Sequence, residues 1–305
     1  MQAMLRAGAV VAAALTLWGA TPDAQRGQNP APEVTVDVIV QDRDGQPVVG
    51  LRPEDFRVRE DGRDVKVTDF RAVTPAEAAS RGQGRSAVLV LDDTGMRPEQ
   101  TVDTRKVADH FLAQAQATDT VAVLRFSQAR DEIAGPRTVM AMRVAEFVGG
   151  ARPFRDPDSF WESLRFVASV SSDLFRLGGE RRRHAIIWVG EPQLIDIREP
   201  PEGEFDQIWP RWVETVMAAS RALASVYAIH PQRGARFDPD GIPAQTGGTV
   251  NELRDPIAGV ERMWNEIGYY YLLTYTPPRT GRQLYKMDVR VDKPDVRVRA
   301  RRTRG

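Results

Sequence analysis

The sequence contains no cysteine among its 305 residues. This absence excludes disulfide bonds, thiolate nucleophiles, zinc sites built on cysteine and a lipid-modified cysteine near the amino terminus. Net charge is absent too, because 42 lysine and arginine residues balance 42 aspartate and glutamate residues. No overall field therefore draws the protein to nucleic acid or to an anionic membrane, and we expect no nucleic-acid partner.

Histidine is scarce, and the patterns of common catalytic sites are missing. The three histidines, His110, His184 and His230, are far apart and form no zinc-binding or nucleophile motif. His230 follows a predicted strand and could face a ligand, although a single histidine beside a proline is more typical of an ordinary loop. The paired glycines lack the lysine and the spacing of a nucleotide-binding loop. We therefore expect a protein that is not an enzyme.

Long hydrophobic runs are also lacking, and one short run lies near the amino terminus. Arg6 precedes an apolar, alanine-rich stretch over 7–17, which is too short for a membrane span and typical of a secretory signal. A permanent anchor is the weaker alternative. We expect a signal peptide over 1–24, a flexible mature terminus over 25–32, and a periplasmic or secreted protein without an integral membrane segment.

The rest of the chain shows two patterns of hydrophobicity. Residues 33–73 alternate apolar and polar side chains around turn signals, which predicts a small β-strand unit. A polar stretch over 74–84 is interpreted as a linker. Over 85–267, short continuous apolar runs alternate with helical periodicity, which predicts an α/β domain with a doubly wound, mainly parallel, Rossmann-like sheet. The expected strands are 87–91, 121–124, 185–189 and 226–229.

The carboxy-terminal segment, 268–305, returns to the strand pattern. We expect its strands to pair with those of 33–73 in an antiparallel unit, because each set alone is too small to bury a stable core. The arginines of this segment include Arg297, Arg299, Arg301, Arg302 and Arg304. These arginines and the run 181–183 are interpreted as solvated side chains that protect an edge strand, with an acidic partner as the alternative. The tyrosines over 269–275 are interpreted as packing between the β unit and the sheet.

Ligands of a doubly wound sheet bind beyond the carboxyl ends of its strands, and the first such position is 92–96. This segment resembles the Asp-x-Ser-x-Ser motif that follows the first strand of von Willebrand factor type A domains. The resemblance is closest to a related family of domains known mainly from Acidobacteria, and it extends over most of the chain. The matching residues are Asp42 to Gly45, Leu51 with Asp55-Phe56, Glu60-Asp61-Gly62, Leu91 to Thr94, Thr246-Gly247-Gly248, and Tyr271 to Tyr275.

The resemblance implies a divalent cation held by oxygen ligands from three loops. Asp92 and Thr94 match the first loop, but Met96 replaces a serine, and a thioether is a poor ligand for a hard ion. The second loop offers Asp158 in place of a threonine. The third loop offers Glu191 in place of an aspartate. The implied metal site is therefore degenerate.

Two interpretations of this site stay open. In the first, the carboxylates of Asp92, Asp93, Asp158 and Glu191 hold Mg²⁺ or Ca²⁺ together with water. In the second, which the missing hydroxyl ligands favour, the metal is lost and the acidic side chains are solvated loop positions.

The function implied by the resemblance is a binding module for protein–protein interaction or adhesion. Its partner would be an unidentified protein or peptide that contacts the loops at the carboxyl edge of the sheet, with Asp93, Met96 and His230 on the rim. Two alternatives belong to other classes. An extracytoplasmic metal-dependent hydrolase would need a water-activating base at the metal, whereas a structural envelope component would need no ligand site.

Overall fold

The computed structural model describes residues 33–128, 133, 137–150, 157–177, 182–190, 205–230, 241–252, 255–279 and 281–305. The expected signal peptide (1–24) and mature terminus (25–32) lie outside these residues and stay predictions. Within the described ranges the chain is mixed α/β, with one parallel sheet and two antiparallel sheets. None of the helices in these ranges is long and apolar enough to span a membrane.

The parallel sheet is built from the short continuous apolar runs. Its strands are β5 (Ser86–Leu91), β6 (Thr120–Arg125), β7 (His184–Val189), β8 (Ala224–His230) and β9 (Val250–Glu252). They lie in the order β6-β5-β7-β8-β9, and neighbouring strands run parallel. Every residue of β5 and β7 is buried, as expected for strands that are covered on both faces. The short edge strand β9 was not predicted.

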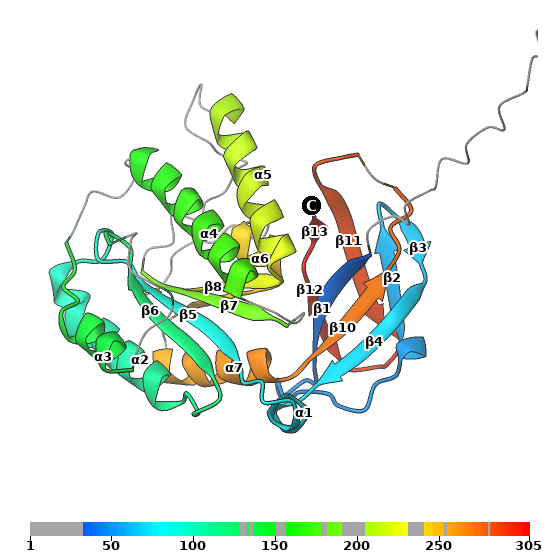
Figure 1. Cartoon of the computed structure of the whole chain (residues 1–305), viewed down its shortest axis with the longest axis horizontal. Helices are drawn as coiled ribbons and strands as arrows, with labels where there is room; N and C mark the ends of the chain where they lie inside the picture. Colours follow the sequence, from blue (N-terminus) through cyan, green and yellow to red (C-terminus); the bar gives the residue numbers. More distant parts are fainter. Residues whose placement is uncertain are drawn as a thin grey trace, which may run out of the picture. The chain divides into compact units, whose positions relative to one another are not determined.

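Helices cover both faces of this sheet (Figure 1). They are α2 (Thr101–Ala113), α3 (Arg137–Ala145), α4 (Pro157–Leu177), α5 (Phe205–Arg221), α6 (Ile242–Thr246) and α7 (Pro256–Gly268). The pair α4 and α5 lies on one face, and the pair α2 and α7 lies on the other. Phe111 of α2 stacks on Trp264 of α7 with ring centroids 4.9 Å apart. The apolar sides of these helices close the core around the strands.

The two antiparallel sheets combine strands from both ends of the described chain. One sheet has the order β12-β1-β10-β4 and the other has the order β13-β11-β2-β3. Their strands are β1 (Val34–Gln41), β2 (Phe56–Glu60), β3 (Arg63–Val65), β4 (Val67–Val73), β10 (Tyr270–Tyr275), β11 (Tyr285–Val291), β12 (Arg297–Ala300) and β13 (Thr303–Arg304). β1 lies between β10 and β12, with Val36 opposite Leu273 and Ile39 opposite Arg299. Buried side chains of both sheets share one apolar core, so they form a sandwich.

The segment 74–84, which the sequence analysis interprets as a linker, contains the short helix α1 (Pro75–Ser80). Glu77 N donates to Thr74 Oγ1 at 3.2 Å, and Thr74 N donates to Glu77 Oε2 at 3.1 Å. This reciprocal capping, with Pro75 in the first turn, favours a helix in a polar segment. The part of the chain that the structure describes also contains the 3₁₀ turns η1 (Pro53–Asp55) and η2 (Pro98–Gln100).

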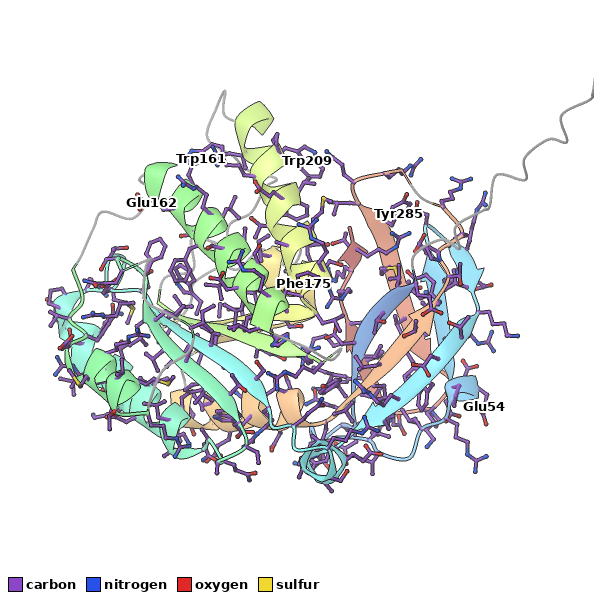
Figure 2. All side chains as sticks on the ribbon, in the orientation of Figure 1. Glu54, Trp161, Glu162, Phe175, Trp209 and Tyr285 are labelled. Carbon is purple, nitrogen blue, oxygen red and sulfur yellow. The ribbon has the colours of Figure 1, made fainter. Side chains whose placement is uncertain are left out.

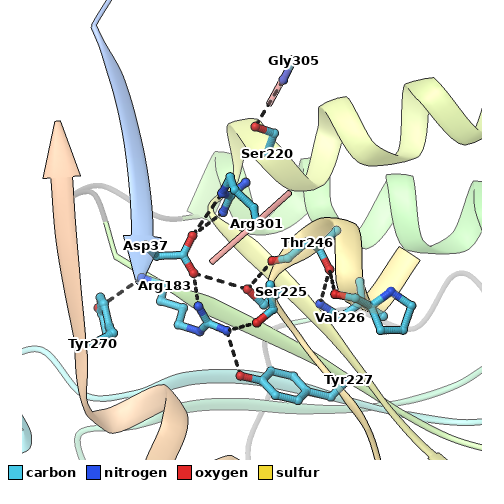
Figure 3. A network of polar contacts seen from close by, with 12 residues as sticks. Asp37, Arg183, Ser220, Ser225, Val226, Tyr227, Thr246, Tyr270, Arg301 and Gly305 are labelled. Atoms are coloured by element: carbon cyan, nitrogen blue, oxygen red, sulfur yellow. Dashed lines mark hydrogen bonds and ion pairs between the residues drawn. The ribbon is translucent and has the colours of Figure 1, made fainter. Parts of the chain in front are cut away.

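Asp37 of β1 pairs with two buried arginines, Arg301 at the end of β12 and Arg183, which connects the sandwich to the parallel sheet (Figure 3). Its carboxylate forms an ion pair with Arg183, which precedes β7. It also accepts hydrogen bonds from Arg301 Nε at 3.1 Å and Nη2 at 2.5 Å. Arg183 Nη2 donates in turn to Tyr227 Oη at 2.8 Å and to the Gly247 carbonyl at 3.0 Å. The side chains of the acid and both arginines are at most 1% exposed.

The interpretation of these arginines as solvated side chains is wrong for Arg183 and Arg301. Burial alone would raise the pKa of Asp37, but the guanidinium groups of Arg301 and Arg183 outweigh that effect and hold the pKa below its usual value. The acid therefore remains charged between two cations. Each guanidinium group can be buried because it meets a counter-charge supplied by a distant segment of the chain.

A second buried ion pair lies within the sandwich and corrects the interpretation of Arg304. Glu60 at the end of β2 accepts hydrogen bonds from Arg304 Nε at 2.7 Å and Nη2 at 2.8 Å. Tyr275 Oη donates to the same carboxylate at 2.6 Å. The Arg304 guanidinium also lies 3.8 Å from the centre of the Tyr285 ring. Arg304 therefore holds the sandwich together and is not a solvated residue.

The tyrosines of β10 serve different parts of the structure. Tyr270 Oη accepts a hydrogen bond from Arg183 N at 3.1 Å, which agrees with the predicted packing between the β unit and the sheet. Tyr271 instead stacks on Phe70 inside the sandwich, with ring centroids 5.7 Å apart. Tyr275 is buried in the same core. The prediction is therefore wrong for Tyr271 and Tyr275.

Replacing Asp37 with alanine should lower the free energy of unfolding by about 3–5 kcal/mol, because two buried guanidinium groups lose their counter-charge. Urea unfolding followed by tryptophan fluorescence measures the change. The exposed pair of Arg57 and Asp292, 2.7 Å apart, supplies a matched control. Asp292→Ala should cost about 0–1 kcal/mol. Equal losses in the two variants would contradict a structural role for the buried carboxylate.

Candidate functional site

The ends of three neighbouring strands of the parallel sheet lie side by side at its carboxyl edge. Leu91 at the end of β5 lies opposite Arg125 of β6 and Val189 of β7. Asp92 N donates to the Val189 carbonyl at 3.0 Å, and Phe126 N donates to the Leu91 carbonyl at 2.9 Å. The segment 92–96 therefore begins between the ends of β6 and β7, the two strands that flank β5.

The Asp92 carboxylate organises this loop from the inside. Its Oδ1 accepts hydrogen bonds from Thr94 Oγ1 at 3.1 Å, Thr94 N at 3.2 Å and Gly95 N at 2.7 Å. A Cβ atom on Gly95 would come within 2.6 Å of Oδ2, and one on Gly190 would come within 2.3 Å of the Asp92 Cβ. Both positions thus leave no room for a side chain. Asp92 is 2% exposed, because the loop and the two glycines enclose it.

Burial sets the protonation of Asp92. It raises the pKa of this carboxyl to about 6, and the N–H and hydroxyl donors of Gly95 and Thr94 offset part of the rise. Trp188 Nε1 lies close enough to lower the pKa slightly, although it makes no hydrogen bond of normal geometry within the described ranges. No described cation compensates the charge of Asp92, in contrast to the two arginines beside Asp37.

Asp93 fixes two neighbouring loops. Ser127 N donates to its Oδ1 at 2.8 Å, and Ser127 Oγ donates to its Oδ2 at 2.5 Å. Gly150 N donates to its backbone carbonyl at 2.8 Å, and a Cβ atom on Gly150 would lie 2.7 Å from that oxygen. Asp93 therefore ties the loop after β6 and the segment before α4 to the loop after β5.

Met96, which the sequence analysis places on the ligand rim, lies in the hydrophobic core. Its side chain is fully buried among the apolar residues of the α/β region, and its N–H donates to the Asp92 carbonyl at 3.2 Å. The placement on the rim is wrong, because a thioether gains more from apolar packing than from water. The motif correctly placed Met96 in the loop after β5, but it did not predict the direction of its side chain.

The remaining candidates are not brought together by the described structure. Asp158 lies in the first turn of α4, and its side chain lies outside the described residues. Glu191 follows β7 and also lies outside them. His230 ends β8, and its side chain is not described either. The assignments of these residues to a metal or a rim stay predictions.

The residues that are described do not form a set of metal ligands. No group of three or more histidine, aspartate or glutamate side chains within these ranges is arranged to hold a metal ion. The Thr94 hydroxyl donates a hydrogen bond to Asp92, and the Asp93 carboxylate accepts one from the Ser127 hydroxyl. These side chains therefore form an internally bonded turn, and the same oxygen atoms keep lone pairs that could face a cation.

A groove of about 490 Å³ opens beside this loop, between the end of β6 and α4. Its apolar lining includes Phe126 and Phe166, whose ring centroids are 5.4 Å apart. Phe126 also contacts Trp188 of β7, with centroids 4.9 Å apart, so the aromatic lining continues into the core of the sheet. The lining as a whole is mixed, with apolar and polar side chains, and a concave surface at this edge of an open α/β sheet is a typical place for a ligand.

The polar lining of the groove comes from the loops and from one face of α4. Thr94 and Ser127 stand at the loop end, and Glu162, Arg165 and Asp173 follow along the helix. The helical stretch from Glu162 to Asp173 is about 16 Å long, at about 1.5 Å per residue. Figure 2 labels Glu162 near the beginning of α4. The sequence analysis missed this surface, although the spacing of Glu162, Arg165, Ser169 and Asp173 at three and four residues was its available signal.

A hydroxyl–imidazole pair exists at the opposite, amino-terminal edge of the sheet. Ser86 Oγ and His184 Nδ1 are 2.7 Å apart, at the first residues of β5 and β7. The two residues are 1% and 3% exposed, and burial lowers the pKa of His184 to about 4. The core encloses this pair, so no substrate can reach it in this arrangement. Its hydrogen bond joins the two strands instead.

No family model and no curated protein matches this sequence. Among solved structures, the human COPII-coat protein Sec24c is similar to this chain with a TM-score of 0.36 and 8% sequence identity. The similarity covers 72% of this chain and 43% of the Sec24c chain. This chain therefore spans less than half of that structure. A similarity at this level establishes neither a family nor a function.

Replacing Asp92 with asparagine should make stability less dependent on pH. The pKa of Asp92 is raised from an ordinary value of 3.8 to about 6, so the folded state binds this proton more tightly than the unfolded chain does. The protein is then stabilised at low pH, and this contribution is lost as the pH rises from about 4 through 6. A shift of two pKa units corresponds to about 3 kcal/mol.

Asp92→Asn should therefore unfold at a higher urea concentration than the wild type at pH 8, with a gain of up to about 3 kcal/mol. The difference should shrink towards pH 4, where the wild-type carboxyl is neutral. Parallel urea titrations across this pH range measure both effects. A constant difference between the two proteins at all pH values would rule out a raised pKa at this position.

Proposed function

We propose that this protein is an exported binding module of the von Willebrand factor A type, which contacts a protein or peptide partner at the carboxyl edge of its parallel sheet. The groove between the Asp92 loop and α4 carries this proposal. It lies where ligands of open α/β sheets bind, beyond the carboxyl ends of the strands. Export rests on the apolar, alanine-rich segment over 7–17.

The shape of the groove favours an extended peptide segment over a compact small molecule. One wall is a helix face about 16 Å long, at about 1.5 Å per residue. The aromatic rings of Phe126 and Phe166 offer apolar contact, and Thr94 and Ser127 offer hydroxyl groups at one end. Glu162 and Arg165 add opposite charges along the helix. An apolar side chain of the partner would fill the aromatic part while its polar groups meet the rim.

The sheet supports the proposed type A fold in its general arrangement. Parallel strands are covered by helices on both faces, and the motif loop follows the strand β5, which lies inside the sheet. In this proposal the acidic motif works as a rigid turn. Asp92 holds the loop from the inside, and Asp93 ties it to Ser127 at the groove. In this proposal partner binding needs no cation, because the hydrogen bonds of Asp92 and Asp93 already hold the turn in place.

Binding should depend on the groove and can be tested by selection from a random peptide library. Ser169 is an exposed residue of α4 that lines the groove, so Ser169→Trp would fill it without disturbing the core. Peptides selected on the wild type should bind this variant at least tenfold more weakly in calorimetric titrations. Leu177→Trp, on the same helix but outside the groove, should bind them unchanged. Equal affinity of the three proteins would place the binding elsewhere.

Divalent cations should leave the stability of the protein unchanged. A specific site at about 100 times its dissociation constant would add about 2.7 kcal/mol and raise the unfolding midpoint by several degrees. We expect no such shift when chelator is replaced by millimolar Mg²⁺ or Ca²⁺ in a thermal scan. A shift that disappears in Asp92→Ala would restore the metal-dependent form of the proposal.

A further inference from the structure

The segment 297–305, referred to here as the strap, carries five arginines and contacts several separate parts of the structure. It contains β12, which pairs with β1, and β13, which pairs with β11. Between these strands, Met287 N donates to the Arg302 carbonyl at 2.7 Å, and Gly305 N donates to Ser220 Oγ of α5 at 3.4 Å. None of its residues lines the groove beside α4, so its role is independent of the proposed function.

Three arginines of the strap each form an ion pair with a carboxylate from a different element. The pairs are Arg299 with Glu266 of α7 at 2.5 Å, Arg301 with Asp37 of β1 at 2.5 Å, and Arg304 with Glu60 of β2 at 2.7 Å. The three acidic residues are at most 7% exposed. A copy whose strap is undocked therefore presents a strand-shaped site with three acidic side chains. This site selects a strand that carries arginines at the same spacing, because buried carboxylates need counter-charges.

The strap can leave its site without breaking the pairing of any other strand. Within the described ranges, β12 and β13 are the outermost strands of their sheets. When they are removed, β1 keeps its ladder with β10, and β11 keeps its ladder with β2. The edges of β1 and β11 are then open to another strand.

The turn 292–296, which joins β11 to the strap, has an unfavourable backbone conformation. Asp295 has a φ of 62°, in the left-handed region that a residue with a Cβ atom rarely adopts. Two exposed ion pairs hold the turn, Arg57 with Asp292 and Arg43 with Asp295, and such pairs contribute little to stability. An extended turn would relieve the strained φ and lose only weak contacts.

These features identify a second copy of this chain as the occupant of an open strap site. Its strap brings the same three arginines at the spacing of the three carboxylates. We propose that the protein forms a dimer by exchange of straps, in which 297–305 of each copy docks on Asp37, Glu60 and Glu266 of the other. Every contact of the strap is kept in this dimer, and only the turn changes. Tethering favours docking within one chain, so exchange takes place while concentrated chains fold.

The natural sequence has no cysteine, so full-length variants with a single cysteine can detect the exchange. Gln41 of β1 lies opposite Arg297 of β12, at a separation that a disulfide can bridge. Gln41→Cys and Arg297→Cys are unfolded in urea, mixed, refolded at high concentration and oxidised. Mass spectrometry should find the 41–297 bridge at least tenfold more often than the 41–66 bridge of a control mixture with Lys66→Cys, an exposed position outside the strap.

Sedimentation velocity on the wild type gives an independent measure. Refolding at high concentration should give a dimer that persists on dilution, because release of a strap breaks buried ion pairs. Asp295→Gly should lower the dimer fraction at least threefold, since glycine adopts the positive φ of the closed turn without strain. Arg43→Ala removes the ion pair of Asp295 but keeps its φ, so this matched control should not lower the fraction.

Three outcomes would overturn the proposal. A 41–297 bridge no more frequent than the control bridge would show that the strap docks only within its own chain. A monomer at every refolding concentration would show the same without any substitution. A dimer that lacks the 41–297 bridge and is insensitive to Asp295→Gly would assign the interface to another surface.

Discussion

The two halves of this protein depend on one buried carboxylate with two cationic partners. Asp37 comes from the first strand, Arg183 from the chain that enters β7, and Arg301 from the end of β12. Burying the acid would be unfavourable alone, and burying either arginine alone would be worse. Together they fix the β-sandwich against the parallel sheet in one orientation, because the guanidinium of Arg183 is also held by Tyr227 and Gly247. Apolar packing alone would tolerate small sliding movements, whereas this set of directed contacts does not.

Helices and strands could be predicted where a pattern of neighbouring residues in the sequence identifies them. The continuous apolar run 87–91 and the alternation around 34–40 identified strands, because burial on two faces and burial on one face leave different patterns. The partners of the arginines could not be predicted in this way. Asp37 and Arg301 are separated by 264 positions in the sequence, and no local pattern distinguishes an arginine with such a partner from a solvated one. The helix α1 was missed for another reason, since its capping by Thr74 and Glu77 lies in a stretch of polar residues.

The candidate site shows the same division. The position of the Asp92 loop followed from the rule that ligands gather beyond the carboxyl ends of parallel strands. The behaviour of its side chains did not follow from the motif. The side chain of Met96 is buried in the core, and the Asp92 carboxylate accepts hydrogen bonds from the backbone of its own loop. The groove beside α4 depends on how far the helix stands from β6, a distance set by aromatic rings such as Phe126 and Phe166. The spacing of polar residues along α4 predicts which face of the helix is polar, but it does not predict that a groove lies beside that face.

The position of β1 between β10 and β12 has a consequence for biosynthesis. Both neighbours of this strand are encoded after the whole α/β region, so β1 remains without its sheet until nearly all of the chain has been made. During that time its apolar face and both of its edges can meet other chains. If the protein is exported with its amino terminus first, β1 would be exposed to other chains after it has crossed the membrane. A chaperone there could protect the early strands. The slow step of maturation should then be the closing of the sandwich around β1, with the α/β region already folded.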